Sequence, residues 1–461
     1  MNNINDRVIL DELSLKAEKN NYIKPEYYDQ FNVKRGLRNS NGTGVLVGLT
    51  EIGSVVGYDI DNDIKCPCQG KLFYRGIDIK SIAKGFQSDN RRGFEETAYL
   101  LLFGELPTSV ELLNFTELLD ECRDLPPGYT ENMILKIPGK DIMNKLQRSV
   151  LTLYSHDLDP DNIDVKNILR QSIELIARVP TIISYGYQAK AHYFDKKSLF
   201  IHKPQPGIGT AENILHMIRS DNKYSKLEAE ILDLSLVIHA EHGGGNNSTF
   251  ATHVVSSSGT DTYSAMTAAI GSLKGPKHGG ANNKVREMIL NIRANVTDWN
   301  DRKKLKDYLS KILKKEVYNK KGLIYGMGHA VYTKSDPRAV LLKKKAYELA
   351  LEKNSVVDFN LYKNIEELTI ELFRELKGDD FNISANVDLY SGFVYEMLGI
   401  PHELYTPIFA AARIVGWCAH RIEQIVSDQK IIRPAYKTVN PRQIYIPIDK
   451  RRPKVSKNIN K

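Results

Sequence analysis

Apolar residues recur every three to four positions along most of the chain after about residue 94. This period places them on one face of a helix and therefore predicts amphipathic α-helices. The clearest segments cover residues 94–104, 166–191, 226–240, 261–275 and 365–378. Alternation of apolar and polar residues, which is typical of strands, occurs mainly in residues 43–60, 70–76 and 442–448. The fold is therefore expected to be predominantly α-helical.

The length and composition are those of an ordinary globular chain. It has 461 residues, of which 42% are hydrophobic and 26% are charged, enough for a sizeable core and two or three domains. Neither an internal repeat nor a long low-complexity linker marks a domain boundary. The cysteines are too few and too scattered for a disulfide framework, which indicates a reducing compartment. They are Cys66, Cys68, Cys122 and Cys418.

The net charge of +8 does not by itself identify a class of partner. The 64 basic and 56 acidic residues are interspersed, apart from the basic tail over residues 450–461, so small anionic substrates explain the excess as well as nucleic acid does. The start of the chain resembles neither a signal peptide nor a transit peptide, and no uncharged apolar stretch approaches about 18 residues. We expect a cytoplasmic protein with no nucleic-acid or membrane partner.

A glycine-rich loop that leads into a helix is the first candidate site. In residues 322–339, GLIYGMGHAVYTKSDPRA, Ser335 or Asp336 suits an N-cap and Pro337 suits the first helical position. Arg338 then lies in the first turn, where the helix dipole disfavours a cation unless an anion meets it. The arginine and the free backbone N–H groups favour a carboxylate or phosphate ligand. The alternative is an ordinary pair with a surface carboxylate.

Histidines precede helices or follow them in two other motifs. His278 stands in the turn GPKHGG, just before a helix that opens near Asn282. The helix dipole disfavours the charged ring, so a neutral His278 could donate a hydrogen bond to a carbonyl that becomes an enolate; the alternative is a surface turn histidine. His239 and His242, three residues apart, could bind a metal, but no H-E-x-x-H pattern is present, so a structural role is favoured.

Three further charged residues are candidates on weaker grounds. Asp388, in NVDLYSGFVYEMLGIP, is most simply an N-cap. Arg413 lies inside an alanine-rich apolar helix, where a buried arginine needs a partner. Arg433, in IIRPAY, is uninformative by itself.

Taken in order, these motifs closely resemble those of the dimeric, all-helical citrate synthase family. The resemblance extends to GLTEIGSVVGYDI, KLFYRGIDI, EETAYLLLFGELP and AENIL, and so covers most of residues 44–436. It implies an all-α, two-domain fold with a few short N-terminal strands. The large domain would comprise residues 1–280 and 391–461, and the small domain residues 281–390.

The resemblance also implies an activity: condensation of acetyl-CoA with oxaloacetate, followed by hydrolysis of citryl-CoA to citrate and CoA. Asp388 would remove a proton from the acetyl methyl group, His278 would donate a hydrogen bond to the thioester oxygen, and His329 would polarise and protonate the ketone. No metal or other cofactor would be needed. The oxaloacetate ligands would be His242, Arg338, Arg413 and Arg433, and CoA would lie along Gly326 and Gly328.

In this family Arg433 would enter the active site of the other subunit, which implies a homodimer with shared sites. Oxaloacetate would close the small domain on the large one before acetyl-CoA binds. Three alternatives stay open: a 2-methylcitrate synthase that uses propionyl-CoA, a catalytically silent CoA-binding regulator, and a zinc hydrolase built on His239 and His242. Lys277, Asn283 and the segment KCPCQ depart from common family patterns.

Overall fold

The computed structural model describes residues 8–39, 41–61, 64–427 and 430–451. The chain divides into two units, one of residues 1–46 with 433–461 and one of residues 47–432. The first unit contains α1 (Val8–Asn21), α2 (Glu26–Gln30) and two short 3-10 turns, Arg35–Leu37 and Ile448–Lys450.

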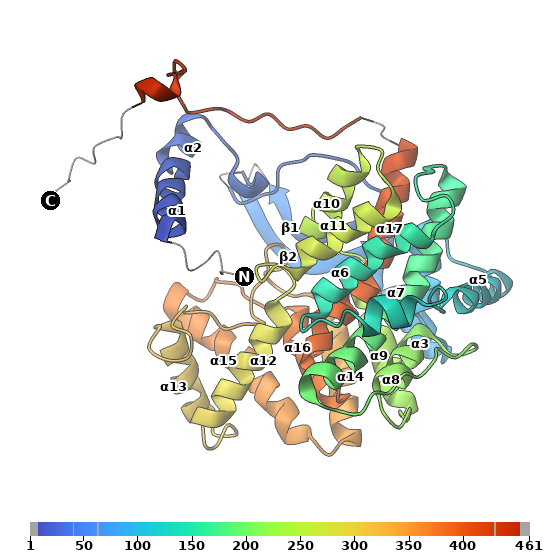
Figure 1. The fold of residues 1–461 in the computed structure, drawn as a ribbon. Coiled ribbons are helices and arrows are strands. Elements are labelled where there is room, and N and C mark those ends of the chain that lie inside the picture. Colours follow the sequence, from blue (N-terminus) through green and yellow to red (C-terminus); the bar gives the residue numbers. More distant parts are fainter. Residues whose placement is uncertain (1–7, 40, 62–63, 428–429, 452–461) are drawn as a thin grey trace. The chain divides into compact units, whose positions relative to one another are not determined.

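The second unit is built almost entirely of helices, which are drawn in Figure 1. Shorter turns of helix occur at Thr130–Leu135, Tyr154–His156 and His402–Leu404. The α-helices are α3 (Ile79–Ser88), α4 (Phe94–Phe103), α5 (Ser109–Cys122), α6 (Ile142–Leu153), α7 (Val165–Asp195), α8 (Thr210–Ile218), α9 (Lys226–His239), α10 (Asn247–Ser256), α11 (Thr262–Lys274), α12 (Ala281–Asn295), α13 (Arg302–Leu313), α14 (Pro337–Glu352), α15 (Val356–Lys377), α16 (Val387–Met397) and α17 (Tyr405–Ser427).

These helices confirm the predicted all-α class, and side-chain caps explain where several of them begin. Thr108 and Glu111 form a capping box at the start of α5, and Ser225 and Glu228 form another at α9. Each box satisfies backbone N–H groups that have no partner within the helix.

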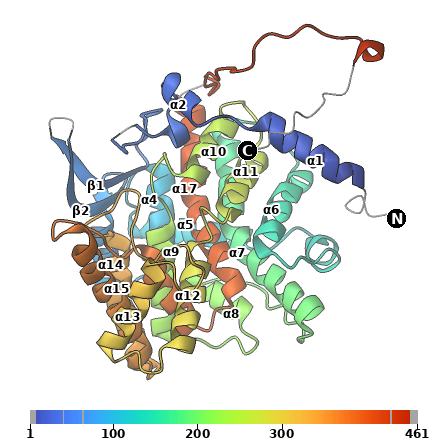
Figure 2. The same ribbon diagram turned by 90° about the vertical axis from the view of Figure 1, so that its left-hand side faces the viewer.

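Helix α17 lies at the centre of the second unit. It packs against α4, α7, α9, α10 and α11, as Figures 1 and 2 show. Most of its length is buried, including Trp417 with 0% exposure. Burial of apolar side chains stabilises the fold by about 25 cal/mol per Å² removed from water. A polar group on this helix is therefore held in a rigid, water-poor setting.

A small antiparallel sheet is the only other regular structure among the described residues. Its strands are β1 (Gly53–Asp61), β2 (Ile64–Tyr74) and β3 (Ile77–Asp78), in the order β1-β2-β3. A side chain at Gly70 would collide with the backbone oxygen of Ser335, so the glycine allows β2 to approach the loop before α14. The sheet thereby supports the loop that contains His329.

The predicted strand over residues 442–448 is wrong. Residues 442–447 have no regular structure, and a 3-10 turn begins at Ile448. Alternation alone cannot make a strand here, because Pro447 lacks an N–H donor and no neighbouring strand offers a partner among the described residues.

Two other expectations concern the organisation of the chain. Helices α12 to α16 pack largely on one another, although α14 also contacts α9, and the proposed boundaries of the small domain stay a prediction. No helix within the described part of the chain is long and apolar enough to cross a membrane.

Candidate active site

Six of the predicted site residues line one cavity of about 170 Å³ in the second unit. Three of them lie in loops and three lie in α14, α16 and α17, and they are spread over residues 242–413. The six are His242, His278, His329, Arg338, Asp388 and Arg413. The sequence motifs therefore converge on a single site.

His329 is held in one tautomer by the loop that contains it. Its Nδ1 accepts hydrogen bonds from the backbone N–H groups of Val331 at 3.0 Å and Tyr332 at 3.1 Å. Burial, reinforced by the charge of Arg338, lowers the pKa of His329 to about 4, so the ring is neutral. The remaining proton is therefore on Nε2, which makes His329 a hydrogen-bond donor.

Asp388 is not the N-cap of its helix. Asn386 caps α16, because its Oδ1 accepts from the N–H of Asp388 at 3.0 Å, and Asp388 occupies the second helical position. Burial raises the pKa of Asp388 to about 6, although Arg338 opposes the shift. The carboxyl side chain makes no hydrogen bond to the described residues. A partly buried carboxyl group with a pKa near neutrality suits a general base.

Arg338 already has an anionic partner in this structure. Its Nε and Nη2 donate to the two oxygens of Asp336 at 3.0 and 2.7 Å. Asp336 is also the N-cap of α14, since its Oδ1 accepts from the Arg338 N–H at 3.0 Å. Burial opposes the ionisation of Asp336, but the charge of Arg338 outweighs it and lowers the pKa of the carboxyl. The pair fixes the guanidinium at the cavity wall.

Arg413 and His242 have polar atoms without partners beside the same cavity. Arg413 Nε donates to the His239 carbonyl at 2.5 Å, while its Nη2 is buried without a hydrogen bond. Burial lowers the pKa of Arg413 to about 10, so it stays a cation at neutral pH. His242 Nε2 is also buried and unpaired among the described residues. Unsatisfied buried polar atoms are costly, and an anionic ligand would pair with Arg413 Nη2 and, when His242 Nε2 holds the ring proton, with His242 as well.

His278 has a hydrogen-bond partner that sequence reasoning missed. Its Nε2 lies 3.0 Å from Ser248 Oγ, on the first turn of α10. Burial and then the charge of Arg413 lower the pKa of His278 to about 4. The predicted helix after it, α12, begins at Ala281, and the side chain of neighbouring Lys277 is exposed. No local signal could have revealed Ser248, because only the fold brings it next to His278.

His239 does not have the geometry of a metal ligand. Its Nδ1 lies 2.6 Å from the Ser235 carbonyl, and burial lowers its pKa to about 3. No cluster of three potential ligands that includes His239 or His242 occurs among the described residues. The favoured structural role of His239 agrees with this geometry, and the zinc hydrolase alternative has no support from it.

The backbone conformation of the glycine loop favours glycine at both predicted CoA-binding positions. Gly326 and Gly328 adopt φ values of 84° and 86°, which favour glycine. A side chain at Gly326 would meet Leu389 at 3.0 Å. Gly328 N–H donates to Ser384 O at 2.8 Å, and Asn386 N–H donates to Gly326 O at 2.9 Å. The loop is thus tied to the start of α16, while contact with CoA stays a prediction.

Arg433 lies in the unit formed by residues 1–46 and 433–461, whereas the cavity lies in the other unit. Its predicted role across a dimer interface stays a prediction. The KCPCQ segment lies in β2, and its two cysteines are free thiols.

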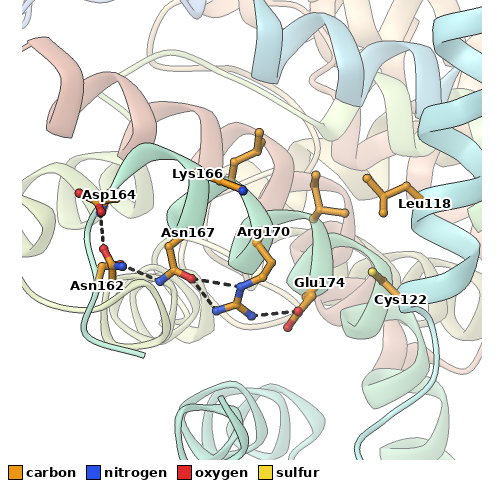
Figure 3. A pocket seen from close by; sticks show the side chains of 10 residues that line it. Leu118, Cys122, Asn162, Asp164, Lys166, Asn167, Arg170 and Glu174 are labelled. Atoms are coloured by element: carbon orange, nitrogen blue, oxygen red, sulfur yellow. Dashed lines mark hydrogen bonds and ion pairs between the residues drawn. The ribbon is translucent and has the colours of Figure 1, made fainter. Parts of the chain in front are cut away.

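A larger hollow of about 520 Å³ lies beside α5 and the start of α7 (Figure 3). Several of its polar groups are paired with one another: Arg170 Nε donates to Asn167 Oδ1 at 3.1 Å and Arg170 Nη1 donates to Glu174 at 3.0 Å. Burial raises the pKa of Cys122, so this thiol is not activated. The smaller cavity is therefore the better candidate for chemistry.

Comparison with known proteins agrees with the geometry of the smaller cavity. The family model described as "Citrate synthase, C-terminal domain" matches residues 40–435. The chain is 32% identical over 427 residues to a citrate synthase of Haloferax volcanii, covering 91% of this chain and 99% of the relative. It is 33% identical over 387 residues to a 2-methylcitrate synthase of Shewanella oneidensis, covering 82% and 92% of the two chains.

Solved structures give the same result. The citrate synthase structure from Pyrobaculum aerophilum superposes with a TM-score of 0.72 at 30% identity, covering 88% of this chain and 94% of that one. A Thermoplasma acidophilum citrate synthase in a ternary complex with carboxymethyl coenzyme A and oxaloacetate gives a TM-score of 0.73 at 27% identity, covering 91% and 99%. The resemblance found in the motifs is confirmed, and the chain belongs to the citrate synthase family.

Proposed function

We propose that this protein condenses acetyl-CoA with oxaloacetate and hydrolyses the citryl-CoA product to citrate and CoA. The observation that carries the proposal is the partly buried Asp388 carboxyl, with a pKa of about 6, in one cavity with two neutral histidines. A methyl group beside a thioester is a very weak acid, so a base must act together with a hydrogen-bond donor that stabilises the enol. Asp388 is the base in this proposal.

His278 is the donor to the thioester oxygen. Ser272 Oγ lies 2.5 Å from Asn247 Oδ1, an acceptor, so the Ser272 proton points there. Ser248 Oγ can donate to Ser272 Oγ at 3.2 Å or to His278 Nε2 at 3.0 Å, and in this proposal it donates to the nearer acceptor, His278. With Nε2 as the acceptor, the ring proton is on Nδ1, which donates to the thioester. Ser248 acts as a positioning residue.

The enol carbon then attacks the ketone carbon of oxaloacetate, and His329 Nε2–H protonates the ketone oxygen as the new carbon–carbon bond forms. The carboxylates of oxaloacetate are bound by Arg413 Nη2, by Nη1 of Arg338 and by His242 Nε2. Water then attacks the thioester carbonyl of citryl-CoA, and CoA leaves as the thiol. The small cavity, with Arg338 and Arg413 buried in its wall, supports the exclusion of water before condensation, since early hydrolysis would waste acetyl-CoA.

The family resemblance supports a homodimer in which Arg433 of each chain binds oxaloacetate in the neighbouring site. A second acyl substrate is also supported, because relatives of 33% and 32% identity are 2-methylcitrate synthases. The proposal is tested by measuring thiol release with oxaloacetate and either acetyl-CoA or propionyl-CoA. A higher kcat/KM for acetyl-CoA is expected. A higher value for propionyl-CoA would assign the second activity, and CoA binding without oxaloacetate-dependent thiol release would indicate a silent regulator.

A further inference from the structure

Two histidines from different helices lie next to each other near the loop that contains His242. His253 lies in α10 and His420 in α17, and His253 Nε2 is 3.2 Å from His420 Nδ1. Glu423 lies three residues after His420, on the same face of α17, and its Oε2 is 3.6 Å from His420 Nδ1. One ligand atom from each of the three residues lies within 4.8 Å of the others.

The outer nitrogen of each ring is held by an oxygen acceptor. His420 Nε2 lies 3.1 Å from Glu241 Oε1, and His253 Nδ1 lies 2.8 Å from Gln424 Oε1. Without an ion, burial lowers the pKa of His420, but the Glu241 and Glu423 carboxylates outweigh it and raise the pKa to about 9, and a second proton on His420 would lie between the rings. In a metal-bound form each neutral ring would keep its proton on the outer nitrogen and direct the lone pair of the inner nitrogen towards the ion. Metal-binding histidines are oriented in this way, by a carboxylate or carbonyl oxygen on the far nitrogen. Two lone pairs 3.2 Å apart repel each other unless a cation lies between them.

The charge around the two rings also calls for a cation. Glu241 has 0% side-chain exposure and Glu423 has 14%, and His420 is the only ion-pair partner of either carboxylate within the described ranges. Each carboxylate also has an Oε2 that is buried without a hydrogen bond to the described residues. The charges of Arg413 and Arg75 also act on Glu241 and Glu423, respectively, but neither arginine forms an ion pair with these carboxylates among the described residues. One proton on His420 would pair with one carboxylate, whereas a divalent ion would compensate both. Buried charges are retained only where they are compensated.

We propose that His253, His420 and Glu423 bind one divalent transition metal ion, for which zinc is the best match. Bonds of about 2.0–2.2 Å in a tetrahedral zinc site place neighbouring ligand atoms roughly 3.3–3.5 Å apart. The observed separations of 3.2 and 3.6 Å bracket that value. Two imidazoles and one carboxylate form a ligand set that suits zinc. Water would take the fourth position, next to Thr50 Oγ1, which is 3.5 Å from His420 Nδ1.

The bound ion would link three parts of the second unit. It would join α10 to α17 directly, and through His420 it would fix Glu241, the residue immediately before His242. The site is therefore structural, and it is distinct from a zinc hydrolase site at His239 and His242. It does not depend on the proposed catalytic activity, because neither His253 nor Glu423 lines the catalytic cavity.

The test uses the full-length protein after removal of metals by chelation and dialysis. Calorimetric titration with zinc chloride should give one ion per chain, and zinc should raise the midpoint of thermal unfolding. Cobalt(II), used as a spectroscopic probe, should give the intense visible absorption of a tetrahedral site. His253→Gln and Glu423→Gln should each weaken zinc binding by at least about tenfold, since even outer partners of metal ligands contribute about 10–100-fold. His402→Gln is the control, because that exposed histidine pairs with Glu403 on the surface.

Absence of stoichiometric zinc binding by the wild-type protein would overturn the proposal, and a proton would then be the cation between the rings. Equal zinc affinity in the wild-type protein and in Glu423→Gln would also overturn it, because binding would then occur elsewhere. Circular dichroism establishes that each variant is folded. Should His253→Gln fail to fold, Glu423→Gln decides the outcome, because glutamine can still accept the hydrogen bond that Glu51 N–H donates to Glu423 at 2.7 Å.

Discussion

Asp336 and Arg338 form a buried, two-point ion pair within the first turn of one helix, with N–O distances of 2.7 and 3.0 Å. Neither side chain is more than 4% exposed. Asp336 also accepts from the N–H of Val387 at 3.2 Å, so the same carboxylate joins the start of α14 to the start of α16. The glycine loop before α14 and Asp388 near the start of α16 are thereby held in a fixed relation.

We expect Asp336→Asn to destabilise the protein by about 3–5 kcal/mol, because it leaves Arg338 buried without its counter-ion. Asparagine can still cap α14, so the loss reports the ion pair rather than the cap. Urea unfolding measures the effect. Asp89→Asn is the matched control: Asp89 pairs with Arg91 at 3.0 Å on the surface and should contribute less than about 1 kcal/mol. Equal losses of unfolding free energy in both variants would show that the buried Asp336–Arg338 pair stabilises the protein no more than the surface pair does.

The raised pKa of Asp388 predicts a pH-dependent cost to stability. Burial raises this pKa from 3.8 to about 6 in the folded protein. Between these values the folded chain holds a proton that the unfolded chain has lost, so the free energy of unfolding falls as pH rises. Asp388→Asn removes the cost and should be more stable than wild type at pH 7.5 by up to about 3 kcal/mol, with little difference near pH 4. The free energies of unfolding of the two proteins are measured with urea across this pH range. A difference between them that is the same at pH 4 and at pH 7.5 would contradict the raised pKa of Asp388.

Ser248 should affect turnover through the tautomer of His278. Ser248→Ala is expected to lower kcat by about tenfold or more, although less than the about 10²–10³-fold loss caused by removing a donor to a developing oxyanion. The KM for oxaloacetate should change little, because Ser248 does not line the cavity. Ser248→Thr keeps the hydroxyl and should restore activity. Ser258→Ala, at an exposed position just after α10, is the control.

Local signals predicted most of the fold and part of the site. The periodic segments became helices, and the residues SDP before Arg338 correctly predicted the start of α14, because an N-cap and a first-turn proline are local properties. The sequence did not predict that Asp336 would also be the anion that meets Arg338. A capping role was sufficient to explain Asp336, and whether its side chain reaches the guanidinium depends on the rotamers that packing allows.

Long-range partners could not be predicted from the sequence in the same way. The residues of two such pairs are far apart in the sequence: Ser248 and His278 are separated by 30 positions, and Glu241 and His420 by 179. The pairs exist only because α10 packs against α11, which precedes His278, and α17 packs against α9, which precedes Glu241. The interpretation of Asp388 as an N-cap failed for a different reason. Asn386, two residues earlier, is an equally good cap, and the exact start of a helix is seldom fixed by the sequence.

A mixing experiment tests the predicted contribution of Arg433 across a dimer. His329→Ala and Arg433→Ala should each be inactive alone. In a mixed dimer, the Arg433→Ala chain keeps its own His329 and receives the intact Arg433 of the partner subunit, so one site of two should recover. Thiol release is measured after subunit exchange has been verified by mass spectrometry. Verified exchange without recovered activity would place Arg433 in its own chain's site.

The most direct test of Asp388 as the base is the turnover of Asp388→Asn with acetyl-CoA and oxaloacetate, with citrate and free thiol measured together. We expect the wild-type protein to form citrate and CoA in equal amounts and only when oxaloacetate is present. The folded Asp388→Asn variant should lose activity by about 10²–10⁴-fold, because asparagine cannot accept the methyl proton. Turnover by this variant within about threefold of wild type would show that Asp388 is not the base.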